Sequence, residues 1–577
     1  MMKKNLILFI LLIFSATGFA AWYLMKQPDP ADGPHLASVL PADTLLLLRI
    51  NHAEKQMEEL RNSPLAKAIE GMDLEASLER AGFPYLIPDG MRNYREWLSS
   101  KWNQKIFNSI FGREAALAIL PEALAFMTPY AEPEDMLKGI AIIARPVQGA
   151  ALASFISPWA PGLDVSEIAP HGNTKIRQIT LANGMALFTS DREGLMLGAF
   201  HLETLKRMLD ASSGSIASLE NNKNFNAMEK ALDDGPRTLS FYGDLATALP
   251  LVDAKLASFA EADDVNDWND IRKMLQGFKN FGYARFNEGT EVRRSLGRAG
   301  MDKKEMDPAL LALLERPARK PEPLWMAPPE TELFFWDGSF DLEYTIQSVL
   351  EDPEDQAAFR GAFEMQTGIL FEDLIHSLGH EMAFIMTEAD EDSVFPLPRL
   401  AIMLESPSPD ILTSLMQNLV NKTEATFGIP LQLQPHSIGN VEITQVQIPM
   451  GEDIQPGWAT MGRYFVFALH WESIADMVRA ESSGNNLVSD ALFQSVDKGL
   501  SGKNKSVTYV RSEALMDTVL AMAMWQATNL AGGNTHVLVS EILAPVLEGL
   551  KMYRASGSRG YTEKDDVVFQ TFTHIRK

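Results

Sequence analysis

The sequence contains no cysteine among its 577 residues. This absence excludes disulfide bonds, thiolate metal sites, cysteine nucleophiles and a cysteine-linked lipid anchor. Basic residues are also scarce, because 51 Lys and Arg stand against 76 Asp and Glu and leave a formal net charge of -25. A strongly acidic surface repels phosphate backbones, so we expect no nucleic-acid partner.

Familiar catalytic motifs are missing as well. The chain has no G-x-S-x-G, no H-E-x-x-H and no G-x-G-x-x-G. His376 and His380 are four residues apart, but Ser377 follows the first histidine where a zinc protease has Glu. We therefore expect no catalytic residue, no cofactor and no metal ion.

The first 26 residues predict a membrane segment. Lys3 and Lys4 precede an apolar run from Leu6 to Met25, whose 20 residues would span about 30 Å as a helix. The positive-inside rule then places the rest of the chain outside the cytoplasm. A cleaved signal peptide is the alternative, with a small-residue site near Ala20. Both interpretations predict export to the periplasm, and the anchor predicts a single-pass inner-membrane protein.

Several stretches occur twice in the same order. Pro41-Ala42-Asp43-Thr44 resembles Pro328-Pro329-Glu330-Thr331, "FGREAALAIL" resembles "LGHEMAFIMT", "IAIIARP" resembles "AIMLESP", and "AFHLETLKRML" resembles "ALHWESIADMV". The offset varies only between 261 residues (Pro146 to Pro407) and 287 residues (Thr44 to Thr331). Such collinear matches indicate a tandem duplication with loop insertions.

The duplication predicts the domain organisation. We expect an anchor or signal segment at 1–26, a proline-rich spacer at 27–36, a first repeat at 37–299, a charged linker at 300–325 and a second repeat at 326–577. Within each repeat, short alternating strands with turn signals are interspersed with helical patterns. The predicted fold class is α+β: two tandem copies of a mixed domain, largely antiparallel sheet with helices packed on it, preceded by one N-terminal transmembrane helix.

These features resemble a bacterial family. The Pro-Asp-Thr turn before a strand, the Gly-x-Glu strand at Gly112 and Glu114, and the strand that ends in a helix cap follow an N-terminal membrane segment. Together they resemble the uncharacterised envelope proteins of the domain of unknown function 3352 family, over most of residues 37–577. The resemblance implies an envelope location and no catalytic residues.

Two histidines recur at corresponding positions. His201 and Glu203 in "HLET" match His470 and Glu472 in "HWES", each where a strand leads into a helix. Free backbone N–H groups at that point favour a polar cap and an early glutamate. These four residues are the candidate recurring ligand-facing positions, with helix capping as the alternative role.

A methionine-rich helical stretch is the second candidate surface. Met516, Met522, Met524 and Trp525 lie within "ALMDTVLAMAMWQATNLAGG", and methionine side chains adapt well to partner proteins. Packing in the core is the alternative. We expect a non-enzymatic binding or scaffolding protein of the envelope, tethered by its N-terminal helix, with an envelope protein or an apolar ligand as partner. An envelope hydrolase without recognisable motifs is the rival hypothesis.

Overall fold

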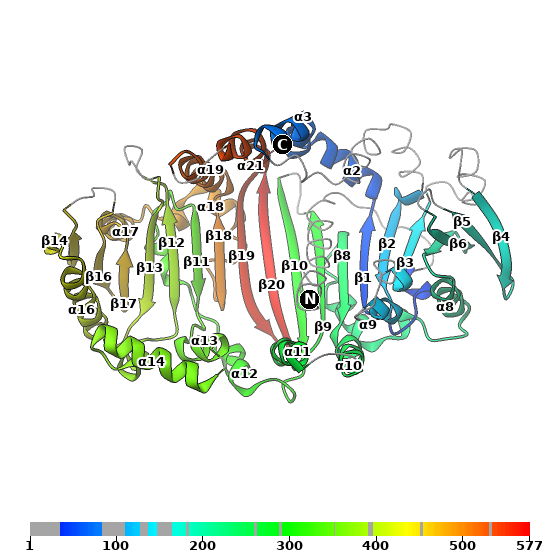
Figure 1. The fold of residues 1–577 in the computed structure, drawn as a ribbon, viewed down its shortest axis with the longest axis horizontal. Helices are drawn as coiled ribbons and strands as arrows, with labels where there is room; N and C mark the ends of the chain where they lie inside the picture. Colours follow the sequence, from blue (N-terminus) through cyan, green and yellow to red (C-terminus); the bar gives the residue numbers. More distant parts are fainter. Residues whose placement is uncertain are drawn as a thin grey trace. The chain divides into compact units, whose positions relative to one another are not determined.

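The computed structural model of the chain describes residues 35–82, 110–126, 137–146, 164–180, 184–258, 262–287, 291–350, 352–389, 396–449, 454–529 and 534–576. The predicted membrane segment at 1–26 lies outside these described residues, and so does most of the spacer at 27–36. The chain divides into two compact units (Figure 1).

The first unit takes its described residues from 1–63, 87–307 and 563–568. Its strands pair antiparallel in the order β4-β5-β6-β7-β3-β2-β1-β8-β9-β10. Their bounds are β1 Leu46–Asn51, β2 Glu114–Ile119, β3 Ile140–Arg145, β4 Asp164–His171, β5 Thr174–Thr180, β6 Ala186–Arg192, β7 Leu195–Ala199, β8 Arg237–Asp244, β9 Phe278–Asn287 and β10 Val292–Met301. The helical segments are η1 Leu36–Val39, α2 Ala53–Asn62, η2 Pro121–Phe126, α8 Leu202–Ser213, η4 Leu219–Asn221, α9 Lys223–Ala231, α10 Leu245–Leu256 and α11 Ala262–Leu275.

The second unit takes its residues from 64–86, 308–562 and 569–577. Its strands follow the order β14-β15-β16-β17-β13-β12-β11-β18-β19-β20. Their bounds are β11 Leu333–Asp337, β12 Met382–Thr387, β13 Arg399–Glu405, β14 Gln432–Ile438, β15 Val441–Gln447, β16 Gly457–Met461, β17 Tyr464–Ala468, β18 Ser506–Val510, β19 Tyr553–Glu563 and β20 Asp566–Ile575. The helical segments are α3 Pro64–Gly71, α4 Leu74–Arg80, α12 Pro308–Glu315, η5 Glu322–Trp325, α13 Leu342–Val349, α14 Pro353–Thr367, α15 Phe371–Ser377, α16 Pro409–Phe427, α17 Trp471–Ser483, η6 Leu487–Ser489, α18 Ala491–Val496, α19 Ser512–Asn529, α20 Thr535–Leu538, the π-helical turn η7 Val539–Leu543 and α21 Ala544–Leu550.

The predicted fold class is wrong in its number of sheets. All twenty described strands belong to one antiparallel sheet, whereas the sequence predicted two separate domains, each with its own sheet. The error arises because sequence patterns reveal the strands but not which strands pair over long distances. In the part of the chain that the structure describes, no helix has both the length and the apolar character needed to cross a bilayer; the transmembrane helix predicted at 1–26 lies outside these residues.

A repeated turn precedes strand β1 in the first unit and strand β11 in the second unit. The Thr44 hydroxyl donates to the carbonyl oxygen of Pro41 at 2.7 Å, and the Thr331 hydroxyl donates to that of Pro328 at 2.6 Å. Both threonines are fully buried. The recurring Pro-x-x-Thr phrase is therefore a buried turn that satisfies its own hydroxyl and directs the chain into β1 or β11.

Each unit includes a short segment from the other half of the sequence. Helices α3 and α4 belong to the second unit, and the β19–β20 turn at 563–568 belongs to the first. Helix α3 packs closely on α21, because a Cβ at Gly549 would lie 2.6 Å from the Cα of Leu65. In the first unit, Arg298 donates to Glu563 at 2.6 Å and to Asp566 at 3.1 Å. Both units therefore depend on residues distant in sequence.

The outermost strand of each order is protected by a proline. Among the described strands, β4, which contains Pro170, pairs with β5 alone, and β14, which contains Pro435, pairs with β15 alone. Proline has no N–H to donate, so it discourages the addition of another strand at an exposed edge. These edges are therefore poor templates for recruiting further strands.

Candidate functional site

The four recurring positions lie at two helix N-termini. His201 is the N-cap residue of α8 and His470 that of α17, both with extended backbone, and neither side chain makes a capping hydrogen bond. Glu203 is on the surface, where the nearby Lys206 ammonium donates to it at 2.7 Å and lowers its pKa. Within each unit these residues flank one helix start, and His171 and His201 lie close enough to Glu203 to lower its pKa further.

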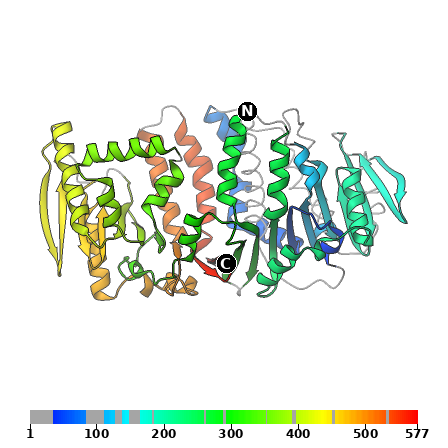
Figure 2. The same ribbon diagram turned by 90° about the horizontal axis from the view of Figure 1, so that it is seen from below.

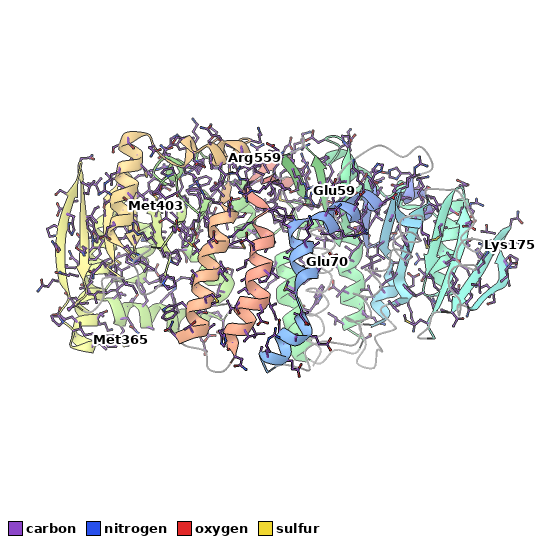
Figure 3. All side chains as sticks on the ribbon, turned by 90° about the horizontal axis from the view of Figure 1, so that it is seen from above. Glu59, Glu70, Lys175, Met365, Met403 and Arg559 are labelled. Atoms are coloured by element: carbon purple, nitrogen blue, oxygen red, sulfur yellow. The ribbon has the colours of Figure 1, made fainter. Side chains whose placement is uncertain are left out.

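The predicted methionine surface is helix α19. Met516, Met522 and Trp525 are half-buried, and Met524 is exposed. The helix packs on α21 and η7, which belong to the same unit. Figure 3 shows these helices side by side with α3. Its apolar residues therefore divide between helix packing and solvent.

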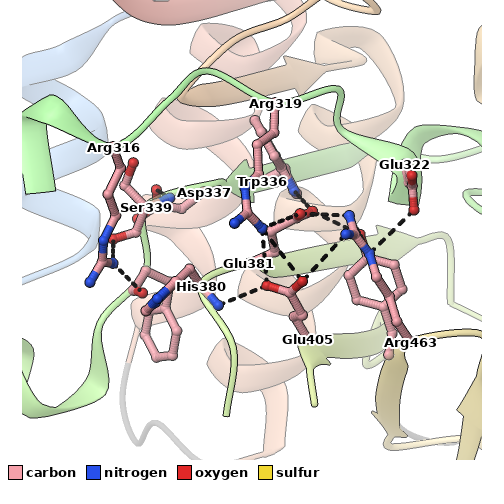
Figure 4. A network of polar contacts seen from close by, with 12 residues as sticks. Arg316, Arg319, Glu322, Trp336, Asp337, Ser339, His380, Glu381, Glu405 and Arg463 are labelled. Carbon is pink, nitrogen blue, oxygen red and sulfur yellow. Dashed lines mark hydrogen bonds and ion pairs between the residues drawn. The ribbon is translucent and has the colours of Figure 1, made fainter. Parts of the chain in front are cut away.

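A network of buried charges lies at the ends of β12 and β13 (Figure 4). The Glu381 side chain has no exposed surface and accepts hydrogen bonds from Arg319 at 3.0 Å and from Arg463 at 2.6 Å. It also accepts from the Trp336 indole at 3.1 Å and from the Tyr464 hydroxyl at 2.7 Å. Burial, together with the Glu381 carboxylate, raises the pKa of Tyr464 far above its usual range.

Glu405 completes this network. Both arginines contact its carboxylate at 3.3 Å, and the backbone N–H of His380 donates to it at 2.8 Å. Gly379 makes room for it, since a Cβ there would lie 2.5 Å from the Glu405 side chain. Two guanidinium groups thus face three carboxylates, because Arg463 also pairs with the exposed Glu322 at 3.3 Å. The four donors around Glu381 occupy its lone pairs. Such a saturated carboxylate stabilises the fold and has no lone pair to offer a substrate.

The first unit has a simpler version of this arrangement. Glu114 corresponds to Glu381, and it pairs with Arg145 on β3 at 3.1 Å, with both side chains nearly buried. The sequence revealed the shared Gly-x-Glu pattern but not its partners. Arg319 and Arg463 lie 62 and 82 residues from Glu381 in the sequence, so no local pattern marks them.

Lys505 is a second group that the sequence did not single out. Burial lowers its pKa to about 8, and its ammonium group donates to the carbonyl oxygens of Leu313 and Leu314 at the end of α12. A cation at this position satisfies carbonyls that the helix leaves free and complements the helix dipole. The hydrogen bonds to Leu313 and Leu314 therefore identify Lys505 as a cap at the C-terminal end of α12.

Glu332 is a buried acid with an uncharged partner. Its side chain is 1% exposed, and both carboxylate oxygens lie 2.9 Å from the Thr518 hydroxyl of α19. Burial raises the pKa of Glu332 above its usual value. A hydroxyl donates only one hydrogen, so it compensates little of the cost of a buried charge.

The raised pKa predicts a pH-dependent stability. A group whose pKa is higher in the folded state favours folding below its unfolded pKa, near 4.5, and this contribution is lost as the pH rises through the folded value. We expect Glu332→Gln to weaken the loss of stability between pH 5 and pH 8. Urea midpoints of the wild-type and variant proteins at both pH values measure it. An equal change in urea midpoint between pH 5 and pH 8 for the two proteins would contradict the expectation.

One face of the sheet in the second unit is packed and the other is open. The packed face carries four side chains without exposed surface: Phe334, Trp336, Val507 and Tyr509. The ring centroids of Tyr509 and Phe493 of α18 are 5.2 Å apart. The alternate residues of the same strands point to the open face. There Phe335 and Phe384 are half-buried, and Ile402 is 39% exposed.

These open-face residues form a continuous apolar row. Phe335 is paired with Phe384, Phe384 with Ile402, and Ile402 with Phe467, on β11, β12, β13 and β17. Phe467 packs against the helix-covered cluster that contains Trp458 and Phe465, so the accessible part of the row is Phe335, Phe384 and Ile402. The half-buried residues Leu333, Met382, Leu400 and Leu404 extend the apolar surface on both sides of the row. An antiparallel sheet normally presents polar side chains on a solvated face. An apolar open face therefore indicates a binding surface.

The first unit has an apolar row at the corresponding strands. Leu48 is paired with Leu117 and Leu117 with Ile142, on β1, β2 and β3, and Phe241 of β8 follows on the other side of Leu48. Leu117 is 39% exposed, as is Ile402. The paired residues on the opposite face, Ala116, Ala118, Ala141 and Ile143, are buried. Leu48 is buried, so the accessible part of this row is the exposed Leu117 with the half-buried Ile142 and Phe241.

Helices border the sheet strands at their ends. In Figure 1 the helices α19 and α21 lie at one end of the strands of the second unit, and α12, α13 and α14 lie at the other. Figure 2 shows α19 and α21 extending away from the sheet. Helix α16 packs on β17 and adds Leu412 and Val420 to a cluster with Trp458 and Phe465. The apolar row therefore lies on the face of the sheet, between the helices at the two ends of the strands.

No protein-family model, curated protein or solved structure matches this chain. The resemblance stated from the sequence therefore stays a prediction. Among the described residues, no group of three or more His, Asp or Glu side chains is placed to hold a metal ion.

Proposed function

We propose that this chain is a non-enzymatic binding protein of the bacterial cell envelope that holds an apolar ligand on the open face of its sheet. The observation that carries the proposal is the apolar row Phe335, Phe384 and Ile402, which lies on a face where solvent would favour polar residues. An accessible Ile or Phe side chain contributes about 1.5–3 kcal/mol when it is fully buried by a ligand.

The occurrence of a comparable row in both units supports binding rather than catalysis. An enzyme requires one site with converging ionisable groups. The most buried carboxylate network, around Glu381, has all its hydrogen-bonding capacity occupied by the protein itself. The envelope location rests on the sequence of residues 1–26, and fractionation of bacterial cells into cytosol, membrane and periplasm tests it.

An uncharged fluorescent dye, N-phenyl-1-naphthylamine, tests the binding surface. We expect the full-length protein to bind the dye, and the double variant Leu117→Gln/Ile402→Gln to bind it about tenfold more weakly, because each row loses one accessible apolar contact. Each single variant should weaken binding at one row and leave the other row at the wild-type affinity. Fluorescence titration measures both quantities.

The matched control is the double variant Met274→Gln/Met365→Gln. These methionines are 73% and 84% exposed and lie outside the rows, one in each unit. The control should bind the dye like the wild type. The proposal would be contradicted if the control and row variants lost binding equally, or if the wild-type protein did not bind the dye.

A further inference from the structure

The chemistry of the open face changes along the row in the second unit. From β17 to β11 the residues are Phe467, Ile402, Phe384 and Phe335. The row then continues with Thr508 on β18 and Ser558 on β19, which are paired with Phe335 and Thr508 respectively. An apolar stretch thus leads directly into a hydroxyl-bearing stretch on the same face.

Two pairs of hydroxyls define the polar end. The Ser558 and Thr571 hydroxyls are 2.7 Å apart, and those of Ser556 and Thr573 are 3.2 Å apart, across β19 and β20. All four side chains are half-buried, so solvent reaches them. A hydroxyl has one hydrogen and two lone pairs, so each pair that shares one hydrogen bond keeps capacity for a further partner. We define Thr508, Ser558 and Thr571 as the hydroxyl row.

We propose that the ligand of the second unit is an uncharged amphiphile with one acyl or alkyl chain and a hydroxyl-bearing head group, such as a monoacylglycerol. This inference rests on the proposed function and specifies its ligand. The chain lies along Phe335, Phe384 and Ile402, and the head group exchanges hydrogen bonds with the hydroxyl row. Adjacent strands are about 4.8 Å apart, so the six strands from β13 to β20 span about 24 Å, enough for an extended chain with its head.

The charges favour a neutral head group. Neither the apolar row nor the hydroxyl row contains an ionisable residue. The whole chain has a net charge of -25, which would repel a carboxylate or phosphate head group. No Lys or Arg on these rows would compensate for the desolvation of an anion.

The first unit does not share this polar end. Phe241 on β8 takes the position of Thr508, and Tyr283 on β9 follows it. Recognition of the head group is therefore a property of the second unit, while both units retain the apolar row. This difference provides an internal comparison between the two units.

Competition against the dye tests the ligand class. Monodecanoylglycerol and decanoate have the same chain and differ in head group. With the full-length wild-type protein, we expect monodecanoylglycerol to displace half of the dye from the second unit at about one tenth of the decanoate concentration. The variant Ser558→Ala/Thr571→Val should abolish this preference and leave the affinity for the dye unchanged, because its apolar row is intact.

Thr460→Val is the matched control. Thr460 is an exposed threonine on β16, at the other end of the sheet from the hydroxyl row. It should keep the tenfold preference. Equal displacement by the two amphiphiles, or a preference unaffected by Ser558→Ala/Thr571→Val, overturns the head-group inference while dye binding still supports the apolar row. Absence of dye binding overturns the proposed function itself.

Discussion

Replacing Glu381 with leucine should lower the free energy of unfolding of the second unit by about 2–5 kcal/mol. The substitution leaves the Trp336 and Tyr464 donors without their acceptor, and each buried donor left unsatisfied costs about 1–3 kcal/mol. Arg319 and Arg463 are 35% and 41% exposed and keep their ion pairs with Glu405, so the lost charge pairing contributes less. Hydrogen exchange of β11, β12 and β17 measures the loss of local stability.

Glu330→Gln is the control for this experiment. Glu330 is an exposed glutamate three residues before the start of β11, so its substitution should change stability by less than about 0.5 kcal/mol. The variant Glu381→Gln keeps an acceptor for Trp336 and should fall between the two. Protection of β12 that stays at the wild-type level in Glu381→Leu would show that the network is dispensable.

Replacing Leu65 with alanine should destabilise a part of the molecule that is encoded nearly 500 residues later. Leu65 of α3 is 3% exposed, and its backbone lies against Gly549 of α21. Large-to-small substitutions of buried leucine cost about 2–5 kcal/mol, and a cavity at this contact would loosen α21. We expect faster proteolysis and faster hydrogen exchange in residues 534–550.

Ile69→Ala provides the comparison, since Ile69 is on the same helix and is 46% exposed. It should leave the 534–550 segment protected. The ion pair between Arg80 and Glu541 adds a second contact between α4 and η7 in the same unit, and Ser77 donates to Glu541 at 2.6 Å. If Leu65→Ala and Ile69→Ala gave the same protection of α21, then α3 would not contribute to the stability of that helix.

Local sequence patterns predicted the strands well but not their environment. The stretches "LFFWD" and "EMAFIMT" are apolar at almost every position, as expected of strands buried on both faces. The structure gives them one buried face and one open face, so Phe335, Phe384 and Ile402 remain accessible. Amino-acid composition does not distinguish an apolar face that is covered by other parts of the protein from one that is left accessible.

Long-range contacts account for the other differences between sequence and structure. The Pro-x-x-Thr phrase at Thr44 and Thr331 marked a turn because its hydrogen bond joins residues three apart. The partners of Glu381 and the docking of α3 join residues distant in the sequence, and their side chains carry no local pattern. The single sheet was missed for the same reason, because strand pairing depends on the whole chain.

The position of α3 has a consequence for biosynthesis. Leu65 leaves the ribosome 484 residues before Gly549 (549 − 65), and translation at about 5–20 residues per second separates them by roughly 25–100 s. During that interval the apolar side of α3 has no native partner to cover it. A nascent chain of this kind depends on a holding chaperone or on a temporary local contact until its C-terminal helices have been made.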